Sequence, residues 1–176
     1  MPVTRRTFIK AGAIGGGVLV AAGAWEAWRL RSCKGDGDGL SPAGRALFAA
    51  VIPAFLDGVV PAASWTPAAM DALLGDIDRT VAQLPPAARN ELQQLACLLD
   101  QGPVRLLLAG TFMPWPRIDA AHAARILARW RFSSTAMLVS AYQALHDLTF
   151  ATWYAAPAHW AATGYPGPPR LTPPAT

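Results

Sequence analysis

Residues 66–84, TPAAMDALLGDIDRTVAQL, hold the clearest helix signal in the chain. Thr66 before Pro67 is typical of a helix start, because a threonine side chain accepts a hydrogen bond from the first free backbone N–H groups and proline fits the first turn. Apolar residues then recur at three- and four-residue spacing and form one stripe: Met70, Leu73, Leu74, Ile77, Val81 and Leu84. Because the charged residues lie off this stripe, the stretch predicts an amphipathic helix packed against other helices.

The same start and stop signals outline four more helices on either side, beginning at Ser41-Pro42, at Pro86, at Asp119 and at Ser133 or Ser134. We expect the first to break near Pro53, the second to stop at Gly102, and the third to run to Arg131. One further short helical turn is expected over 104–109, and 112–116 is predicted to be a rigid aromatic loop. No window alternates strictly between apolar and polar residues, so we expect no sheet. The predicted fold class is all-α: a compact, irregular bundle of about five helices over residues 41–156.

The last predicted helix is apolar nearly all round, with Met137, Leu138, Tyr142, Leu145, Leu148 and Trp153. We therefore expect it to lie at the centre of the bundle or against another subunit. His146 and Asp147 are neighbours on it, and consecutive helical residues point about 100° apart. The sequence thus predicts no preformed acid–base pair there, and His146 is interpreted as a buried hydrogen-bonding residue or one at an interface.

Residues 1–24 carry the pattern of a twin-arginine signal peptide. The string Thr4-Arg5-Arg6-Thr7-Phe8-Ile9-Lys10 contains the residues of the address, Arg5, Arg6, Phe8 and Lys10, and an uncharged run over 11–24 follows it. Ala22 and Ala24 mark a small-residue cleavage site. The apolar run would span about 21 Å as a helix, less than the roughly 30 Å hydrocarbon core, so cleavage is favoured over an uncleaved membrane anchor. We expect a periplasmic protein, with a flexible linker over 25–40.

Composition excludes several classes of function. The formal net charge of the chain is +4, but three of its basic residues lie in the leader, and no basic patch for nucleic acid remains without it. The three histidines are scattered and lack metal-binding spacing. No phosphate loop, dinucleotide fingerprint or nucleophile elbow occurs. The sequence therefore predicts no catalytic residues, no metal and no cofactor in this chain.

Cys33 and Cys97 are the two cysteines of the chain. In an oxidising compartment they can form one disulfide. The alternative, two separate thiols with Cys97 simply buried on its helix, is equally open at this point.

Several segments together resemble the small subunits of bacterial flavin-dependent dehydrogenases. They are the leader, residues 51–58 (VIPAFLDG), residues 144–148 (ALHDL), Trp153-Tyr154, and residues 164–169 (GYPGPP). The family is the gluconate 2-dehydrogenase subunit 3 type, with its sorbitol, fructose and glucose dehydrogenase relatives. The resemblance implies a large partner subunit of glucose-methanol-choline type that holds FAD, and a cytochrome c subunit that can take the electrons. It also implies that this chain is a non-catalytic escort, which carries its signal-less partner through the twin-arginine translocase and stabilises it.

The C-terminal region, residues 157–176, is predicted to be an extended, proline-rich tail. The segment from Trp153 to Pro169 is the candidate partner interface, with Trp153, Tyr154, Trp160 and Tyr165 as large anchors and Pro166 and Pro168 as stiffening residues. The alternative is that these aromatic side chains fold back and cap the bundle. Two further functions remain open: an independent periplasmic enzyme using His146 and Asp147, and a helical module that binds a small ligand.

Overall fold

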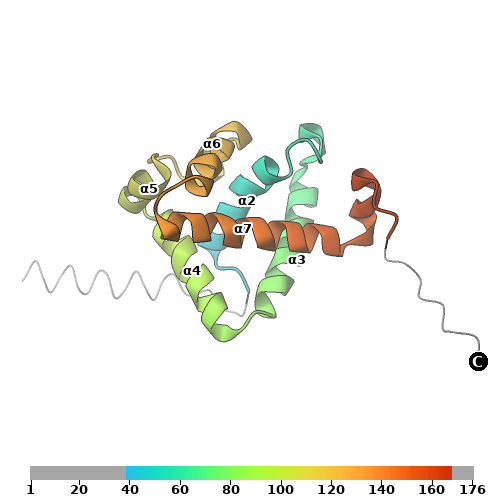
Figure 1. The fold of residues 1–176 in the computed structure, drawn as a ribbon, viewed down its shortest axis with the longest axis horizontal. Coiled ribbons are helices and arrows are strands. Elements are labelled where there is room, and N and C mark those ends of the chain that lie inside the picture. Colours follow the sequence, from blue (N-terminus) through green and yellow to red (C-terminus); the bar gives the residue numbers. More distant parts are fainter. Residues whose placement is uncertain (1–38, 168–176) are drawn as a thin grey trace, which may run out of the picture.

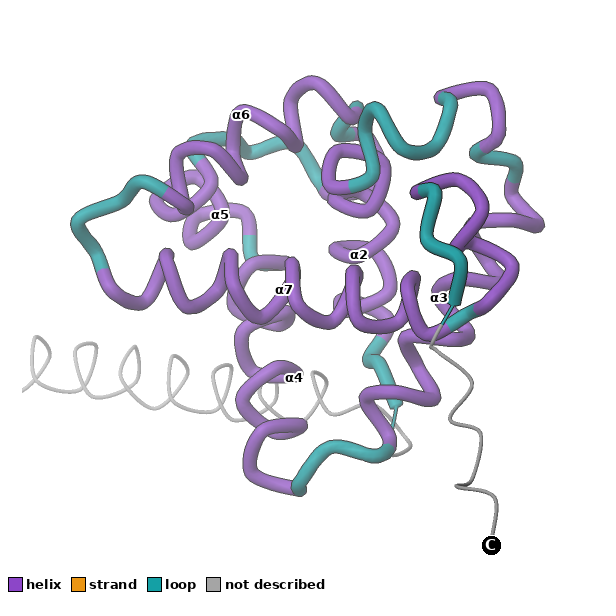
Figure 2. Tube along the Cα trace, turned by 45° about the vertical axis from the view of Figure 1, so that its right-hand side comes forward, coloured by secondary structure: helices purple, strands orange, loops and turns teal. Residues whose placement is uncertain are grey.

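The computed structural model describes residues 39–167, and these residues form helices joined by short loops (Figures 1 and 2). The α-helices are α2 (Pro42–Phe55), α3 (Pro67–Ala82), α4 (Pro86–Asp100), α5 (Gly102–Ala109), α6 (Ala120–Arg131) and α7 (Ala136–Ala155). Three 3-10 helices lie between or after them: η1 (Ala62–Ser64), η2 (Trp115–Arg117) and η3 (Pro157–Thr163). No residue of 39–167 is in a strand, so the all-α prediction is confirmed.

Helix α2 is the centre of the core. It packs against α6, α4 and η2, and to a lesser extent against α3 and α7. Its side chains Leu47, Phe48 and Ile52 are completely buried. The chain enters this helix between α3 and α4, where the Leu40 N–H donates to Asp78 Oδ1 at 2.5 Å and Gln93 Nε2 donates to the Gly39 carbonyl at 3.1 Å.

The predicted break near Pro53 is wrong, because α2 continues through Pro53 to Phe55. Proline removes one backbone N–H donor from the helix. The next turn nevertheless closes, since the Leu56 N–H donates to the Ile52 carbonyl at 3.0 Å. Both Ile52 and Leu56 are completely buried, and their packing holds the chain in register.

Three predicted helix starts are confirmed by their capping bonds. Ser41 Oγ accepts from the Gly44 N–H, Thr66 Oγ1 from the Ala69 N–H, and Asp119 Oδ1 from the His122 N–H. The predicted serine cap of the last helix is wrong. Thr135 is the N-cap of α7 and makes no side-chain cap bond, while Ser133 Oγ accepts from the Thr135 N–H in the preceding turn.

The boundary between α4 and α5 also differs from the prediction. Gly102 does not follow a helix end as a cap but begins α5, which is a helix of 8 residues. Helix α5 instead ends at Gly110, whose backbone φ of 68° lies in the left-handed region that glycine adopts without strain. Within the predicted aromatic loop over 112–116, Phe112 and Met113 are exposed, whereas Trp115 begins η2 and is completely buried.

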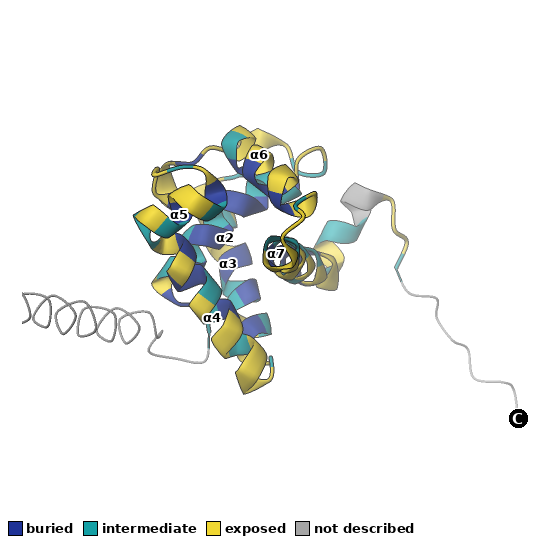
Figure 3. Cartoon of the chain, turned by 60° about the vertical axis from the view of Figure 1, so that its left-hand side comes forward, coloured by how far each residue is buried: buried dark blue, intermediate teal, exposed yellow. Residues whose placement is uncertain are grey.

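Helix α7 crosses the surface of the bundle and packs on α3, α6 and α2 (Figure 1). Only one side of it is buried, by Ala141, Leu145, Thr149, Thr152 and Trp153. Viewed nearly along its axis, its outer side is exposed (Figure 3). Of the two predicted positions for this helix, the centre of the bundle is therefore wrong, because α2 already fills the core, and the position against another subunit stays a prediction.

The predicted extended tail over 157–176 is corrected in its first part, since residues 157–163 form η3. Residues 165–167 lie in no helix, and Gly164 and Gly167 have positive φ angles of 69° and 95°. Pro168 and the following residues lie outside the described residues, as do the leader residues Arg5, Arg6, Phe8 and Lys10, the cleavage-site residues Ala22 and Ala24, most of the 25–40 linker, and Cys33. Among the described helices, none combines the length and the apolar character needed to cross a membrane.

Candidate functional site

Four ring-bearing side chains form a ladder along α7: Tyr142, His146, Phe150 and Tyr154. Their spacing of four residues places them on one face of the helix, because residues i and i+4 are neighbours on its surface. Successive ring centroids are 5.7, 4.5 and 5.8 Å apart, and the first and last pairs are stacked. We call these residues the α7 ladder.

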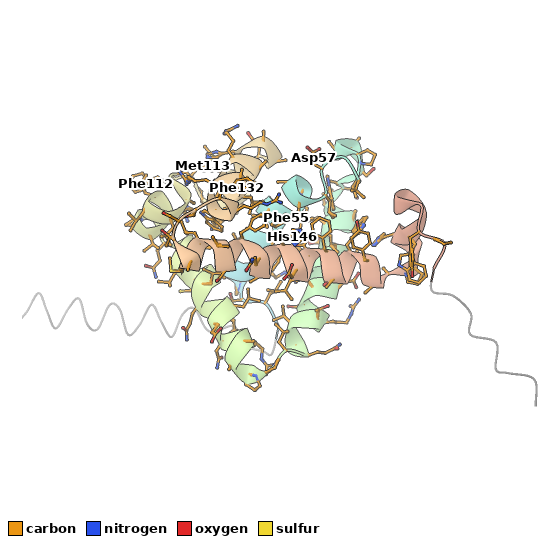
Figure 4. The ribbon with its side chains drawn as sticks, viewed as in Figure 1. Phe55, Asp57, Phe112, Met113, Phe132 and His146 are labelled. Carbon is orange, nitrogen blue, oxygen red and sulfur yellow. The ribbon has the colours of Figure 1, made fainter. Side chains whose placement is uncertain are left out.

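Phe55, the last residue of α2, packs edge-on against the α7 ladder. Its ring centroid lies 5.6 Å from those of Tyr142 and His146 and 6.2 Å from that of Phe150. Edge-to-face packing is a favoured geometry for aromatic pairs, so these contacts hold the rings in place. Figure 4 shows Phe55 and His146 close together at the middle of α7.

A pocket of about 340 Å³ opens between the ends of α2 and α6 and the α7 ladder. Its lining includes Phe55, Leu127, Arg131, Phe132, Tyr142, His146 and Phe150. The Arg131 guanidinium lies 5.3 Å from the Phe132 ring centroid and 5.9 Å from that of Tyr142, within the range of cation–π attraction. No described carboxylate lies within ion-pair distance of Arg131. We call this the α2–α6–α7 pocket.

His146 and Asp147 form a hydrogen-bonded pair, contrary to the prediction from their adjacent positions. His146 Nδ1 lies 2.9 Å from Asp147 Oδ1. The backbone directions diverge, but rotation about the side-chain bonds brings the two groups together. The pair is not buried, since the side chains are 39% and 78% exposed. Of the two interpretations of His146, the buried residue is therefore wrong, although the residue is hydrogen-bonded, and the residue at an interface stays a prediction.

Large apolar side chains gather on the neighbouring surface over α5 and the end of α6. The most exposed are Leu107 at 82% and Phe132 at 78%, and the others are Leu106, Phe112 and Met113. Figure 4 shows Phe112, Met113 and Phe132 at the end of the molecule where α5 and α6 lie, and Figure 3 shows the exposed outer sides of both helices. We call these five residues the α5–α6 face.

This end of the molecule is basic. Residues 102–135 contain five arginines and one aspartate, a net charge of +4. Four of these arginines are exposed: Arg117, Arg125, Arg129 and Arg131. By contrast, residues 66–100 contain five acidic residues and two arginines, a net charge of −3. The apolar α5–α6 face thus lies on the positive half of a polarised molecule.

The structure divides the predicted interface residues between core and surface. Trp153 is only 8% exposed and stacks on His159 with 3.5 Å between ring centroids. His159 Nδ1 also lies 2.8 Å from the Trp153 carbonyl oxygen. Little of the Trp153 ring is therefore available to a partner. Tyr154, the last residue of the α7 ladder, remains exposed.

The other predicted anchors fold back toward the end of α7. Trp160 Nε1 donates to the Tyr154 carbonyl at 2.7 Å, and the Trp160 and Tyr165 rings meet edge-on with centroids 5.3 Å apart. Tyr165 and Pro166 are nonetheless exposed. The described part of the predicted interface, residues 153–167, thus has features of both alternatives. Part of it caps the bundle, and part of it exposes aromatic side chains.

A second groove, of about 630 Å³, runs between α3, α4 and α7. Its lining is mostly apolar and includes Leu84, Leu92, Leu95, Ala144 and Leu148, with Asp147 at its edge. No group of three potential metal ligands occurs among residues 39–167. The three histidines lie on α6, α7 and η3.

Cys97 is buried on α4 and is bonded in a disulfide. Cys33, the other cysteine of the chain, lies outside the described residues. The pairing of Cys33 with Cys97 therefore stays a prediction.

Sequence reasoning missed the residues that build the α2–α6–α7 pocket, namely Phe55, Arg131 and Phe132. They come from the ends of two helices and meet the third only in the folded chain. One sequence signal was available, the four-residue spacing of Tyr142, His146, Phe150 and Tyr154, which indicates a single aromatic face.

No protein-family model matches the chain, and no curated protein and no solved structure matches it either. The resemblance to dehydrogenase small subunits therefore rests on the residues quoted above and stays an expectation.

Proposed function

We propose that the chain is a non-catalytic accessory subunit of a periplasmic flavin-dependent dehydrogenase. Its partner is a large subunit of glucose-methanol-choline type that holds FAD and does the chemistry, and a cytochrome c subunit can complete the complex. The chain binds the signal-less large subunit in the cytoplasm, escorts it through the twin-arginine translocase and stabilises it after export.

The observation that carries this proposal is the exposed α5–α6 face with the adjoining α7 ladder. Aromatic side chains, methionine and arginine are enriched in protein interfaces, and a cluster of exposed large apolar residues marks an interaction site. Phe132 and Leu107 are largely exposed in the chain alone, so a partner that covered them would remove much apolar surface from water.

The leader supports the same proposal from the sequence. Residues 4–10 carry the twin-arginine pattern, and that pathway exports folded proteins. A flavoprotein must fold around its cofactor before export, so a partner without a signal needs an escort that has one. The resemblance of residues 51–58 and 164–169 to dehydrogenase small subunits agrees with this role.

Affinity purification of the tagged chain from its native cells tests the proposal. We expect a yellow protein with bound FAD to copurify in a fixed ratio, and dehydrogenase activity to follow that complex. The isolated small chain should show neither flavin nor activity. Recovery of the chain alone, with turnover of a substrate by itself, would contradict the proposal.

A second candidate function, a small-ligand-binding module, is favoured by the apolar groove between α3, α4 and α7. Its volume of about 630 Å³ falls within the range of small-molecule sites. Native mass spectrometry of the exported chain distinguishes the two functions. A chain that is monomeric and carries a small molecule in stoichiometric amount supports the module, whereas a heteromeric flavin complex supports the accessory subunit.

A further inference from the structure

We propose that the α2–α6–α7 pocket receives an anchor from the partner protein, an aromatic side chain with a carboxylate beside it. This inference rests on the proposed function, because it names the chemistry by which the partner subunit is recognised. The carboxylate binds Arg131, and the aromatic ring packs among Phe55, Phe132 and the α7 ladder.

The walls of the pocket suit a planar ring. Phe55 meets Tyr142, His146 and Phe150 at interplanar angles of 61°, 82° and 67°. A ring inserted beside these side chains can stack on one of them while meeting another edge-on, the two arrangements that aromatic pairs prefer. The rings that form the walls already pack on one another, so little side-chain freedom is lost when an anchor enters.

The rim of the pocket suits a carboxylate. Arg131 is exposed and has no acidic partner among residues 39–167, while the rings of Phe132 and Tyr142 hold its guanidinium by cation–π attraction. A guanidinium presents paired N–H donors that match the two oxygens of a carboxylate. The rim therefore offers a positive group that is held in place and free to bind an anion.

No carboxylate among residues 39–167 lies within ion-pair distance of Arg131 to compete for it. Asp147, the acidic residue of α7, is bonded to His146 and lines the groove between α3, α4 and α7. His146 uses Nδ1 for that bond, and its Nε2 has no hydrogen-bond partner in the described part of the chain.

The charge distribution favours the same partner. The exposed arginines of 117–131 give the surface around the pocket a positive potential, which attracts an acidic protein surface during encounter and turns it toward the pocket. The apolar α5–α6 face beside it then supplies the area that a stable complex needs. The half formed by 66–100 has the opposite net charge, −3, and would repel the same acidic surface.

A probe titration tests the chemistry of the pocket without the partner. The exported chain is titrated with N-acetyl-L-phenylalanine and with N-acetyl-L-phenylalanine amide, which differ in the carboxylate, while its aromatic NMR signals are followed. We expect binding at about 1 mM or weaker, with shifts at Tyr142, His146 and Phe150, and an affinity for the acid at least about threefold above that for the amide. Equal affinities, shifts confined to the other groove, or no shift for either probe would overturn the inference.

Charge reversal tests the role of the pocket in the complex. We expect Arg131→Glu to weaken the complex with the flavoprotein at least about tenfold, with the loss reduced in high salt. Arg131→Lys should retain part of the affinity, because it keeps the charge but not the planar fork. Arg125→Glu is the matched control, since it makes the same change on an exposed residue of the same helix outside the pocket. Equal weakening by both reversals would overturn the inference.

The two proposals fail in different ways. If no flavoprotein binds the wild-type chain, the proposed function is wrong, although probe binding that depends on Arg131 would still support the chemistry of the pocket. If the flavoprotein binds wild-type chain and Arg131→Glu equally well, the proposed function stands and the inference is wrong. Thermal melts of each variant show whether the substitution has disturbed the fold.

Discussion

At the scale of single residues, the charged side chain of Arg105 is buried and bonds to backbone carbonyls of the fold. It is 4% exposed, and its guanidinium donates to the carbonyls of Asp100 at 2.7 Å, Leu99 at 3.3 Å and Phe112 at 3.0 Å. The indole of Trp115 also donates to the Leu99 carbonyl at 3.0 Å. The bonds to Leu99 and Asp100 satisfy carbonyls at the end of α4 that have no partner within the helix, where a positive charge is favourable. The bond to Phe112 joins the loop after α5 to the same side chain.

We expect Arg105→Met to lower the free energy of unfolding by about 3 kcal/mol, because it leaves buried carbonyls without donors. Urea unfolding followed by circular dichroism measures the change. Arg125→Met serves as the control, since removal of an exposed arginine without bonds should change the stability by less than about 0.5 kcal/mol. Equal effects of the two substitutions would show that the Arg105 bonds do not matter.

At the scale of elements, α7 and η3 divide their aromatic residues between the fold and the surface. Trp153 belongs to the core, where its ring stacks on His159 and its centroid lies 6.3 Å from that of Trp65. Tyr154 and Tyr165 remain exposed on either side of Trp160. The end of α7 is therefore both a cap on the bundle and a continuation of the α7 ladder.

We predict that Trp160→Ala combined with Tyr165→Ala weakens the complex at least about a hundredfold, because interface anchors typically contribute about 2 kcal/mol or more each. Fluorescence titration against the partner subunit measures the affinity. Trp153→Ala is the comparison, and it should instead lower the stability of the isolated chain by about 3 kcal/mol. The opposite pattern for the double variant, a large loss of its own stability with partner affinity retained, would show that these two residues serve the fold.

At the scale of the whole molecule, the exposed apolar face and the point where the chain enters the domain lie on halves of opposite charge. The basic end carries the exposed apolar face, and the acidic end carries the point where residues 39 and 40 enter between α3 and α4. The leader precedes residues 39 and 40 in the sequence. Because these two residues bond to α3 and α4, the chain enters the domain away from the α5–α6 face.

We predict that Cys33 and Cys97 are joined in the exported protein. The loop between them is long, and on the chain-entropy model closing it stabilises the fold by about 4 kcal/mol. Non-reducing peptide mass spectrometry detects the linked peptides, and chemical unfolding with and without reductant measures the effect. Free Cys33 in freshly isolated protein would refute the link.

Export gives the second prediction at this scale. Replacement of Arg5 and Arg6 together by lysine should block export, since the receptor reads the paired guanidinium groups and lysine lacks their planar fork. Cell fractionation and immunoblotting of both subunits measure the result, and the partner should remain in the cytoplasm with the variant. Normal periplasmic amounts of the double variant would falsify the leader assignment.

Much of the helical framework was predictable because its signals are local. Thr66 and Asp119 cap their helices through bonds that span three residues. The stripe of α3 behaves as its spacing predicts, with Leu73, Leu74, Ile77 and Val81 all buried. A hydrogen bond or a helix face that involves residues three or four apart depends on the chain nearby, so the sequence alone was sufficient.

Tertiary packing decided the end of α2, the position of α7 and the existence of the α2–α6–α7 pocket. Pro53 stays within α2 because its neighbours Ile52 and Leu56 fill the core, and α7 lies at the surface because α2 already occupies the centre. The α2–α6–α7 pocket joins Phe55, Arg131 and His146, which lie far apart in the sequence, so its existence depends on how three helices cross. The amino-acid sequence by itself determined where most helices begin and which face of α3 is apolar. Only the tertiary structure decided which side chains meet, because side-chain contacts between distant segments follow from the packing of whole helices.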